Sequence, residues 1–440
     1  LSYGRVDYTM GHYVAPPDEV QRIGGSEVMI SVEEAREIVL ASVEKIGWEY
    51  VELLDSLGRV LAEDVTAPEP IPPWDNAAMD GYALRGEDTR GASAEQLVPL
   101  KLIGTIGAGQ IFDGSLEKEQ AVRIMTGAPM LRGADAVIRQ EDTQTSEQGV
   151  FVLREVRPGQ NVRYTGEDVK AGEQVLSTGT ICRPGVIGLM AAIGRGRVAV
   201  YHRPRVGILA TGDELLRWDE ASSPGKIHNS NSFALAAQVR QAGGVPVLVG
   251  PVADARDVLA QRLREGIRTD MLLTTGGVSV GDYDIVVDTL QELGAEVRVR
   301  KVYMRPGKPF TFALLEQKPI CALPGNPISC MVTFELFVRP ALRKMQGYRS
   351  LFPTEIMATA SQPIPNKDRR PAYLRVMLSQ TDAGFTARLT GDQGSAMLHS
   401  MAHANGLAVI PGETEVPVGS QVLVLLLADE VVATTPELHP

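Results

Sequence analysis

A regular alternation of apolar strands and helices over residues 205–345 limits the fold of this 440-residue chain more than any other feature. The pattern predicts strands at four apolar runs, 206–210, 245–250, 271–275 and 320–324, and helices at three intervening segments, 232–242, 255–267 and 284–293. Buried strands that alternate with helices are typical of a parallel sheet with helices on both faces. We therefore expect a doubly wound α/β domain over residues 205–350.

Polar and glycine-rich sequence follows three of these strands. Ligands of open α/β sheets bind beyond the carboxyl ends of the strands, where glycines let backbone N–H groups approach a phosphate and helix N-termini add their dipole. Three such loops at one sheet edge predict an anion site. The candidate ligands are Thr211, Gly212, Asp213 and Glu214 after the first strand, Gly276, Gly277, Ser279, Gly281 and Asp282 after the third, and Pro324, Gly325, Asn326 and Ser329 after the fourth.

A local run of basic residues lies in the same predicted domain, over residues 298–308, and contains no acid. The whole chain has 43 basic and 54 acidic residues, a net charge of −11, so this excess indicates an anion site. Arg298 and Arg300 alternate with valine and fit a solvated strand face, whereas Lys301, Arg305 and Lys308 border a Pro-Gly turn and are the better ligand candidates. The overall negative charge argues against nucleic acid as a partner.

Acidic residues fall at the ends of the same strands and suggest a metal. Carboxylates beside a phosphate site commonly hold Mg²⁺, which makes Glu214, Asp254 and Asp284 candidate ligands. Asp254 precedes a predicted helix and could equally be its cap. His399 and His403 are four residues apart, as metal ligands on a helix would be, but no carboxylate or thiolate lies nearby in the sequence, which favours incidental spacing.

The rest of the chain divides by its pattern. Residues 1–28 show no helical or strand period, and we expect a disordered leader. Ser31 and Glu34 form a capping-box sequence that predicts the start of the first helix. The expected domains are a mixed α/β domain from residues 29–60 plus 170–204, an inserted β-rich domain at 61–169, the α/β domain at 205–350 and a small β-domain at 351–440.

The cellular compartment is predicted from what the sequence lacks. No stretch reaches the roughly 20 apolar residues that cross a bilayer, and the N-terminus does not have the pattern of a secretory signal. The three cysteines, Cys182, Cys321 and Cys330, are widely spaced and fit buried thiols in a reducing compartment. We expect a cytoplasmic protein without membrane contact.

Eight segments together resemble the MoeA family of molybdopterin molybdenumtransferases, which is similar to the C-terminal domain of gephyrin. The resemblance runs from about Ser31 into the C-terminal domain. The segments are PPWDNAAMDGYA, RIMTGAP, GEDV, ATGDEL, NSN at 229–231, TTGGVSVGDYD, KVYMRPGKPF and LPGNPISC.

The resemblance implies a homodimer of four-subdomain chains that inserts molybdate into adenylylated molybdopterin with Mg²⁺-dependent release of AMP. It also implies transient contacts with other proteins of cofactor synthesis and with acceptor enzymes. Carried over by motif, the catalytic residues are Asp75, Thr126, Asp168, Glu214, Asp254, Asp284, Lys301 and Arg305, and further ligands are Asn229, Ser230, Asn231, Arg369, Arg370 and Ser395. Arg305 stands where many members have lysine, which replaces a point charge with a planar fork, and Ala77 stands where serine is common.

Two other functions account for less of the sequence. An adenylyltransferase that makes the activated pterin resembles only residues 205–345, and the remaining chain counts against it. A non-enzymatic scaffold, as gephyrin is for receptors, would be expected to carry a fused partner domain. No Ser-His-Asp or Cys-His pattern stands out, which fits a reaction whose leaving group is already in place and whose catalysis rests on positioning and charge.

Overall fold

The computed structural model describes residues 29–147, 149–252, 255–277 and 285–427. The chain forms two units, Trp48–Val200 and a second unit made of Leu1–Gly47 with Tyr201–Pro440. Helix α1 (Val32–Ala41) belongs to the second unit, so the predicted N-terminal domain is divided at Gly47. The other predicted domain boundaries stay predictions.

The capping box predicted for α1 is present. Ser31 accepts a hydrogen bond from the Glu34 N–H at 3.1 Å, and the Glu34 carboxylate accepts one from the Ser31 N–H at 2.8 Å. These bonds satisfy amide groups that a helix start otherwise leaves unpaired. Val32, Ala35 and Val39 on one side of the helix are buried.

A six-stranded sheet forms the centre of the second unit, and it is mixed rather than wholly parallel. In sheet order the strands are β16 (Val245–Val252), β13 (Arg205–Thr211), β17 (Met271–Thr275), β20 (Lys318–Leu323), β19 (Thr311–Leu315) and β18 (Glu296–Val299). The first four are parallel, as predicted, and the last two pairings are antiparallel. A tight turn at Glu316 and Gln317, with φ of 51° and 62°, joins β19 to β20 and so requires antiparallel pairing.

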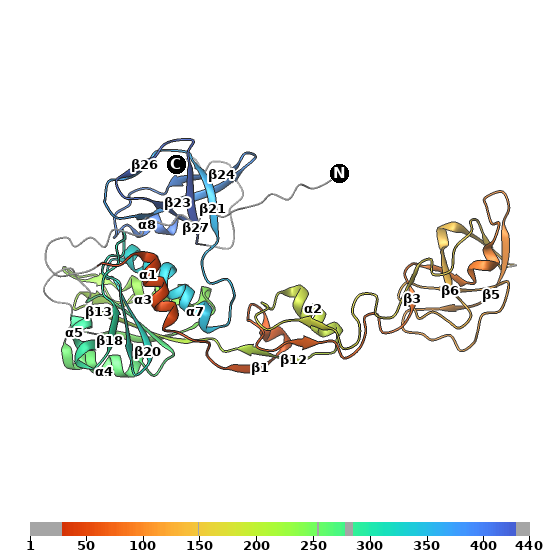
Figure 1. The fold of residues 1–440 in the computed structure, drawn as a ribbon, viewed down its shortest axis with the longest axis horizontal. Coiled ribbons are helices and arrows are strands. Elements are labelled where there is room, and N and C mark those ends of the chain that lie inside the picture. Colours follow the sequence, from red (N-terminus) through yellow and green to blue (C-terminus); the bar gives the residue numbers. More distant parts are fainter. Residues whose placement is uncertain (1–28, 148, 253–254, 278–284, 428–440) are drawn as a thin grey trace. The chain divides into compact units, whose positions relative to one another are not determined.

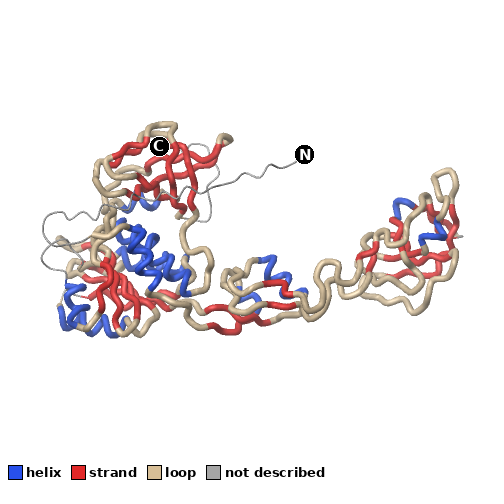
Figure 2. The backbone as a smooth tube through the Cα atoms, viewed as in Figure 1, coloured by secondary structure: helices blue, strands red, loops and turns tan. Residues whose placement is uncertain are grey.

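Helices cover both faces of this sheet (Figures 1 and 2). Side chains alternate along the strands: Met271 and Leu273 enter one core, and Leu272 between them enters the other. The first core is completed by α1, α3 (Ser230–Gln241), α6 (Pro327–Thr333), the π-helical turn η4 (Phe334–Val338) and α7 (Arg339–Met345). The second is completed by α4 (Arg256–Gly266) and α5 (Ile285–Glu292).

One ion pair is buried among the helices of the first core. Glu335 accepts a hydrogen bond from Arg339 Nη1 at 3.0 Å and another from Gln238 Nε2 at 2.8 Å. The side chains of Glu335 and Arg339 are only 4% and 6% exposed. Removing one partner would therefore leave an uncompensated charge in the core.

The predicted C-terminal β-domain is a closed five-stranded barrel. The strands are β21 (Glu355–Ala360), β24 (Gly384–Leu389), β23 (Ala372–Thr381), β25 (Gly406–Ile410) and β27 (Gln421–Leu426). A small pair, β22 (Ile364–Asn366) and β26 (Thr414–Val416), and the short helix α8 (Leu398–Ala402) complete it. Closure removes the free sheet edges that would otherwise invite further pairing.

The unit Trp48–Val200 is β-rich, as predicted for the inserted part. Its six-stranded sheet contains, in order, β7 (Ala136–Arg139), β4 (Gly81–Leu84), β6 (Gln120–Ile124), β5 (Val98–Ile106), β9 (Gly149–Val152) and β8 (Thr143–Ser146). Three strand pairs and helix α2 (Pro184–Ala192) make up the remainder: β1 (Trp48–Glu52) with β12 (Arg197–Tyr201), β3 (Asn76–Ala77) with β10 (Val162–Arg163), and β2 (Val65–Thr66) with β11 (Gln174–Leu176).

The cysteines are free and buried, which confirms that part of the sequence prediction. Burial raises the pKa of all three thiols, because the interior disfavours the thiolate. Among the described residues, no helix is long and apolar enough to cross a membrane.

Candidate functional site

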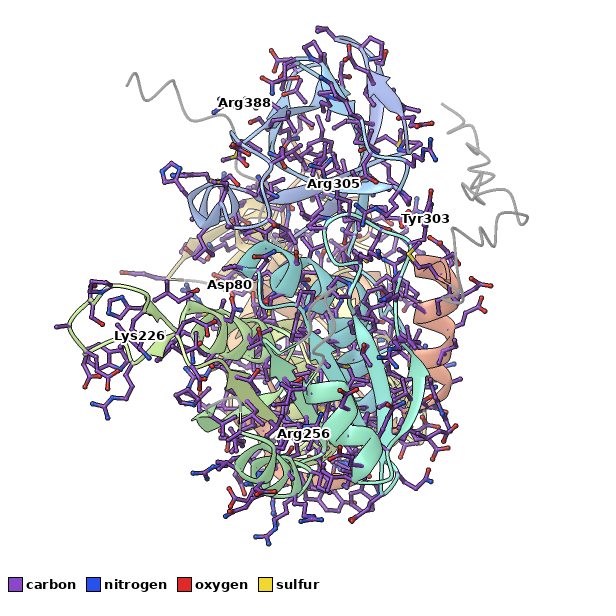
Figure 3. All side chains as sticks on the ribbon, turned by 90° about the vertical axis from the view of Figure 1, so that its left-hand side faces the viewer. Asp80, Lys226, Arg256, Tyr303, Arg305 and Arg388 are labelled. Carbon is purple, nitrogen blue, oxygen red and sulfur yellow. The ribbon has the colours of Figure 1, made fainter. Side chains whose placement is uncertain are left out.

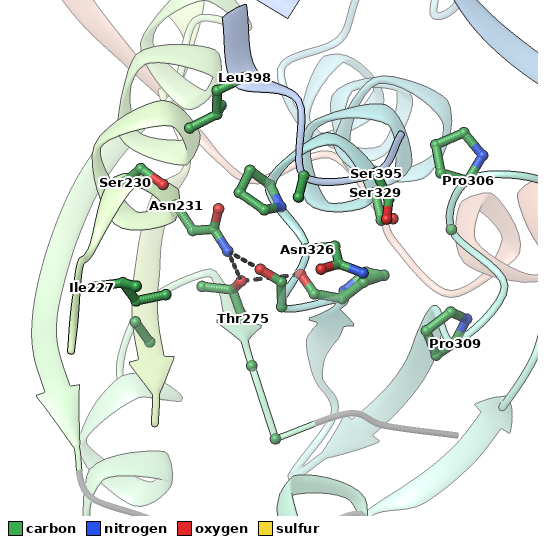
Figure 4. A pocket seen from close by; sticks show the side chains of 18 of the residues that line it. Ile227, Ser230, Asn231, Thr275, Pro306, Pro309, Asn326, Ser329, Ser395 and Leu398 are labelled. Atoms are coloured by element: carbon green, nitrogen blue, oxygen red, sulfur yellow. Dashed lines mark hydrogen bonds between the residues drawn. The ribbon is translucent and has the colours of Figure 1, made fainter. Parts of the chain in front are cut away.

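A cavity of about 1040 Å³ opens at the carboxyl ends of β13, β17 and β20, where it also meets segments of the barrel (Figure 4). The structure gathers most of the predicted ligands of the second unit in its lining. They are Thr211, Glu214, Asn229, Ser230, Asn231, Gly276, Gly277, Arg305, Lys308, Pro324, Gly325, Asn326, Ser329, Arg370 and Ser395.

Other predicted residues are not brought into this lining. Gly212, Asp213, Lys301 and Arg369 lie elsewhere among the described residues, and Arg369 pairs with Glu413 at 3.3 Å. A further set lies outside the described residues: Asp254, Ser279, Gly281, Asp282 and Asp284.

Glycine is required where the strand-end loops meet. Gly276 has φ of 91°, and a Cβ atom there would collide with the backbone carbonyl of Thr211. A Cβ on Gly277 would come within 2.8 Å of the Thr211 hydroxyl and 2.6 Å of Val286. The loops after β13 and β17 can therefore touch only because these positions carry no side chain.

An amide clamp joins the walls of the cavity. Asn231 at the start of α3 donates from Nδ2 to Thr275 Oγ1 at 2.8 Å and to the Gly325 carbonyl at 2.8 Å. Thr275 donates in turn to the Pro324 carbonyl at 3.2 Å. Figure 4 shows this chain of bonds running across the cavity from one strand end to the next.

Two buried oxygens of the lining have no hydrogen-bond partner among the described residues. Thr211 is 2% exposed, and its hydroxyl makes no hydrogen bond within the described residues. The same holds for Oδ1 of Asn231, whose Nδ2 forms the clamp. Burying a polar group without a partner costs about 1–3 kcal/mol, so both atoms are suited to bind a polar ligand.

The charge of the described lining is mainly positive. Among the described residues of the lining, Arg305 and Lys308 stand beside one acid, Glu214. Arg370 also lines the cavity and forms a bidentate pair with Asp368, with bonds of 2.6 and 2.8 Å. The Arg370 hydrogen bonds lower the pKa of Asp368 to about 2. Such a lining favours an anionic ligand, consistent with the basic run in the sequence.

Arg305 stands at the junction of sheet domain and barrel (Figure 3). Its N–H donates to the Pro371 carbonyl at 2.9 Å, and its carbonyl accepts from the Tyr373 N–H at 2.8 Å. These bonds fix the backbone at the start of β23 against the basic loop. The backbone of Arg305 is thus fixed by hydrogen bonds, while its guanidinium-bearing side chain is exposed.

A buried arginine that the sequence prediction missed supports the barrel side of the cavity. Arg375 on β23 is 0% exposed. It donates from Nη2 to the carbonyls of Asp392 and Gly394 at 2.7 and 3.1 Å, and from Nε to Ser400 Oγ at 2.7 Å. Burial lowers its pKa to about 10, and its Nη1 has no hydrogen-bond partner within the described ranges. The available signal was a single arginine inside the apolar run AYLRVML.

Arg375 thereby shapes a loop that borders the cavity, residues 391–395. Gln393 accepts from the Arg375 N–H at 2.8 Å, and both Gln393 and Ser395 line the cavity. The Ser395 carbonyl accepts from the Ile328 N–H at 3.1 Å, which ties the loop to the first turn of α6. Hydrogen bonds therefore connect residues of the barrel and of the sheet domain in this wall of the cavity.

The predicted residues of the other unit share one group of linked loops. Asp75 accepts from the N–H and hydroxyl of Thr165 at 2.7 and 2.8 Å, and its carbonyl accepts from Met130. Thr126, four residues before Met130, donates from its N–H and hydroxyl to Asp80, both at 2.7 Å. These bonds lower the pKa of the Asp80 carboxyl.

Asp168 belongs to the same loop group. Its N–H donates to the carbonyl of Ile71 at 3.0 Å, and its side chain is exposed. Asp75 follows Ile71 by four residues in the segment IPPWD. Asp75, Thr126 and Asp168 are all exposed, so the group can contact a ligand or another protein surface.

Comparison with known families matches almost the whole described chain. Residues 30–194 match the MoeA N-terminal region (domain I and II), residues 207–344 match a probable molybdopterin binding domain, and residues 357–427 match the MoeA C-terminal region (domain IV). A molybdopterin molybdenumtransferase from a Nostoc species is 39% identical over 91% of this chain and 94% of its own length. The enzyme of that name from Bacillus subtilis is also 39% identical, over 87% of this chain and 90% of its own.

Solved structures agree with the sequence comparison. The molybdopterin biosynthesis moeA protein from Pyrococcus horikoshii is 32% identical, with a TM-score of 0.78 over 90% of this chain and 100% of that one. A second structure of a moea protein from the same organism has a TM-score of 0.77 at 29% identity. The resemblance seen in the sequence is confirmed, and the chain belongs to the MoeA family.

Proposed function

We propose that this chain is a molybdopterin molybdenumtransferase of molybdenum-cofactor biosynthesis, which inserts molybdate into adenylylated molybdopterin and releases AMP. The observation that carries the proposal is the cationic cavity at the strand ends, with two buried oxygens that find no partner in the described part of the chain. A ligand with a phosphate, a polar ring system and an incoming oxyanion would supply hydrogen bonds to these oxygens and charge to Arg305 and Lys308. The names of the relatives support the same activity.

Catalysis on this proposal is a matter of placement. Arg305 and Lys308 hold the anionic groups of the ligand and lower the repulsion as a second anion approaches. The Asn231 clamp fixes the strand-end loops, so little ordering remains to be done when the ligand binds. The chain does not need a nucleophile, because adenylylation has already provided a leaving group.

The lining suits a bound Mg²⁺. This ion commonly takes one or two protein carboxylates and completes its shell with water and substrate phosphate. Glu214 offers one exposed carboxylate at the cavity, and we propose Asp254 and Asp284 as the others. When bound, Mg²⁺ would neutralise negative charge on the phosphate that leaves with AMP.

We further propose that the enzyme is a cytoplasmic homodimer with shared sites, in which Asp75, Thr126 and Asp168 of one chain complete the cavity of the other. Family resemblance and the exposure of these three residues support this arrangement. Isologous pairing would create two equivalent composite sites. The free, buried thiols suit a reducing compartment.

The activity is tested by AMP release from adenylylated molybdopterin with molybdate, with and without Mg²⁺. We expect release only when both are present, and a drop on the order of 100-fold for Arg305→Ala, the cost of losing about 3 kcal/mol of charge stabilisation. The matched control is Arg388→Ala, an exposed arginine on β24 outside the cavity lining, which should retain the wild-type rate. ATP consumption without AMP-linked molybdate insertion would instead indicate the adenylyltransferase, and no turnover of either kind would indicate a scaffold.

The shared site is tested by mixing Asp75→Ala chains with Arg305→Ala chains. A heterodimer isolated through two different tags would contain one site with both lesions and one site with neither. It should recover about half of the wild-type rate if the sites act independently. Activity as low as that of either parent in a verified heterodimer would mean that Asp75 serves its own chain.

A further inference from the structure

Two histidines, His399 on α8 and His403 at the C-cap of that helix, lie within ligand distance of a common ion. His399 and His403 are one helical turn apart, and their Nε2 atoms are 3.3 Å from each other. Their rings meet edge to face, with centroids 4.6 Å apart and an interplanar angle of 65°. Both side chains are exposed, so an ion from solvent can reach them.

The distance between the two nitrogens matches the edge of a metal coordination sphere. Two Zn–N bonds of about 2.0–2.1 Å at a tetrahedral angle place the nitrogens roughly 3.4 Å apart. Without a metal, one imidazole must place its N–H between the two nitrogens and the other must accept it. A metal ion would take the place of that single proton, with little change in either side chain.

We propose that His399 and His403 form a binding site for a divalent transition-metal ion such as Zn²⁺ or Ni²⁺, held through both Nε2 atoms. Imidazole nitrogens suit these ions and suit Mg²⁺ poorly. Among the described residues no group of three or more metal-binding side chains occurs, so we expect water in the remaining positions. The site is therefore weaker than a closed structural zinc site, and its ion exchanges with solvent.

The ion would act on the wall of the cavity through α8. This helix is only five residues long, Leu398–Ala402. Leu398 lines the cavity, and Ser400 accepts the hydrogen bond from Arg375 Nε at 2.7 Å. A metal clip across one turn would hold the helix in its observed form and so reduce opening of this wall. The proposal does not depend on the transferase activity.

The test is titration of the metal-free, full-length protein with Zn²⁺ and Ni²⁺, measured by calorimetry and reversed with a chelator. We expect one ion per chain at this site, and an affinity lower by on the order of 100-fold in His399→Gln and in His403→Gln, since each leaves a single ligand. Mg²⁺ should not compete. Hydrogen exchange of residues 398–402 should slow on metal addition in the wild type and remain unchanged in both variants.

A matched control keeps the number of histidines constant. Arg388 is exposed on β24, and Arg388→His combined with His399→Gln restores the count without restoring the pair. This double variant should bind as weakly as His399→Gln alone. Equal affinity in the wild type and in the variant lacking both histidines, with circular dichroism confirming the fold of each, would overturn the proposal and leave the contact as a hydrogen bond only.

Discussion

Replacing Arg375 should weaken the barrel, and the size of the effect depends on two opposing contributions. Arg375→Met keeps most of the length but loses three side-chain hydrogen bonds, to Asp392, Gly394 and Ser400. Hydrogen bonds of charged groups contribute about 1.5–3 kcal/mol each. Against this, methionine removes a buried cation whose pKa burial lowers to about 10, a relief of about 3 kcal/mol. We expect a net loss of about 1.5–6 kcal/mol.

Arg375→Lys should be the more damaging change, although it is chemically closer. Lysine keeps a cation in the same buried position and therefore keeps the desolvation penalty. Its single ammonium cannot reproduce the planar fork that reaches two carbonyls and a hydroxyl. The predicted order of stability is wild type, then methionine, then lysine.

Hydrogen exchange measures this order of stability in the barrel itself. The three tryptophans, Trp48, Trp74 and Trp218, all lie outside the barrel, so their fluorescence does not report on it. Amides of β23 and of residues 391–400 should lose protection in both variants, and the KM for the adenylylated pterin should rise because Gln393 and Ser395 line the cavity. Arg388→Met, on an exposed face of β24, is the control and should change neither quantity. A lysine variant as stable as the wild type would refute the reasoning.

Three other perturbations have definite expected outcomes. Gly276→Ala should lower the melting temperature far more than Gly294→Ala. Both glycines have positive φ, but only a Cβ at position 276 would collide with backbone, so Gly294→Ala should lower the free energy of unfolding by only about 1–2 kcal/mol. Asp368→Asn should lower the free energy of unfolding by up to about 2 kcal/mol. The pKa of Asp368 in the folded protein, about 2, lies below the usual 3.8, so the wild type is more stable above pH 4 and loses this advantage toward pH 2. Urea titrations at several pH values measure this difference. Arg339→Met should cost about 3–5 kcal/mol by leaving Glu335 charged and buried, and adding Glu335→Leu should restore much of it; equal melting temperatures for single and double variants would contradict this.

The strand–helix alternation predicted the α/β domain well because each central strand is buried on both faces and reads as an unbroken apolar run. The antiparallel edge was missed because β19 looks like any other short apolar strand, and only the tight turn at Glu316 and Gln317 requires it to run antiparallel to β20. Pairing direction depends on backbone conformation at two residues that carry no glycine signal.

The lining of the candidate site was predictable where residues follow a strand directly and hidden where it depends on long-range packing. Thr211, Gly276 and Asn326 were predicted from their positions after apolar runs, and all three line the cavity. Arg375 was not, since its role arises from a loop that returns to it 17 to 19 residues later in the chain. A charged residue inside a strand usually faces solvent, but here the loop at residues 391–395 covers Arg375 and shields it from solvent.

The cavity wall joins two folding domains through a few hydrogen bonds, such as that between Ser395 and Ile328. A ligand bound there would bridge sheet domain and barrel and act as a reversible cross-link between them. By thermodynamic reciprocity, the factor by which bound ligand favours contact between barrel and sheet domain equals the factor by which that contact raises the ligand affinity. The ligand should therefore make the two domains unfold more cooperatively. A chain that ends at residue 350 would keep the strand-end loops but lose the barrel side of the cavity. It should therefore bind the proposed pterin substrate weakly, and binding should not increase the cooperativity of its unfolding.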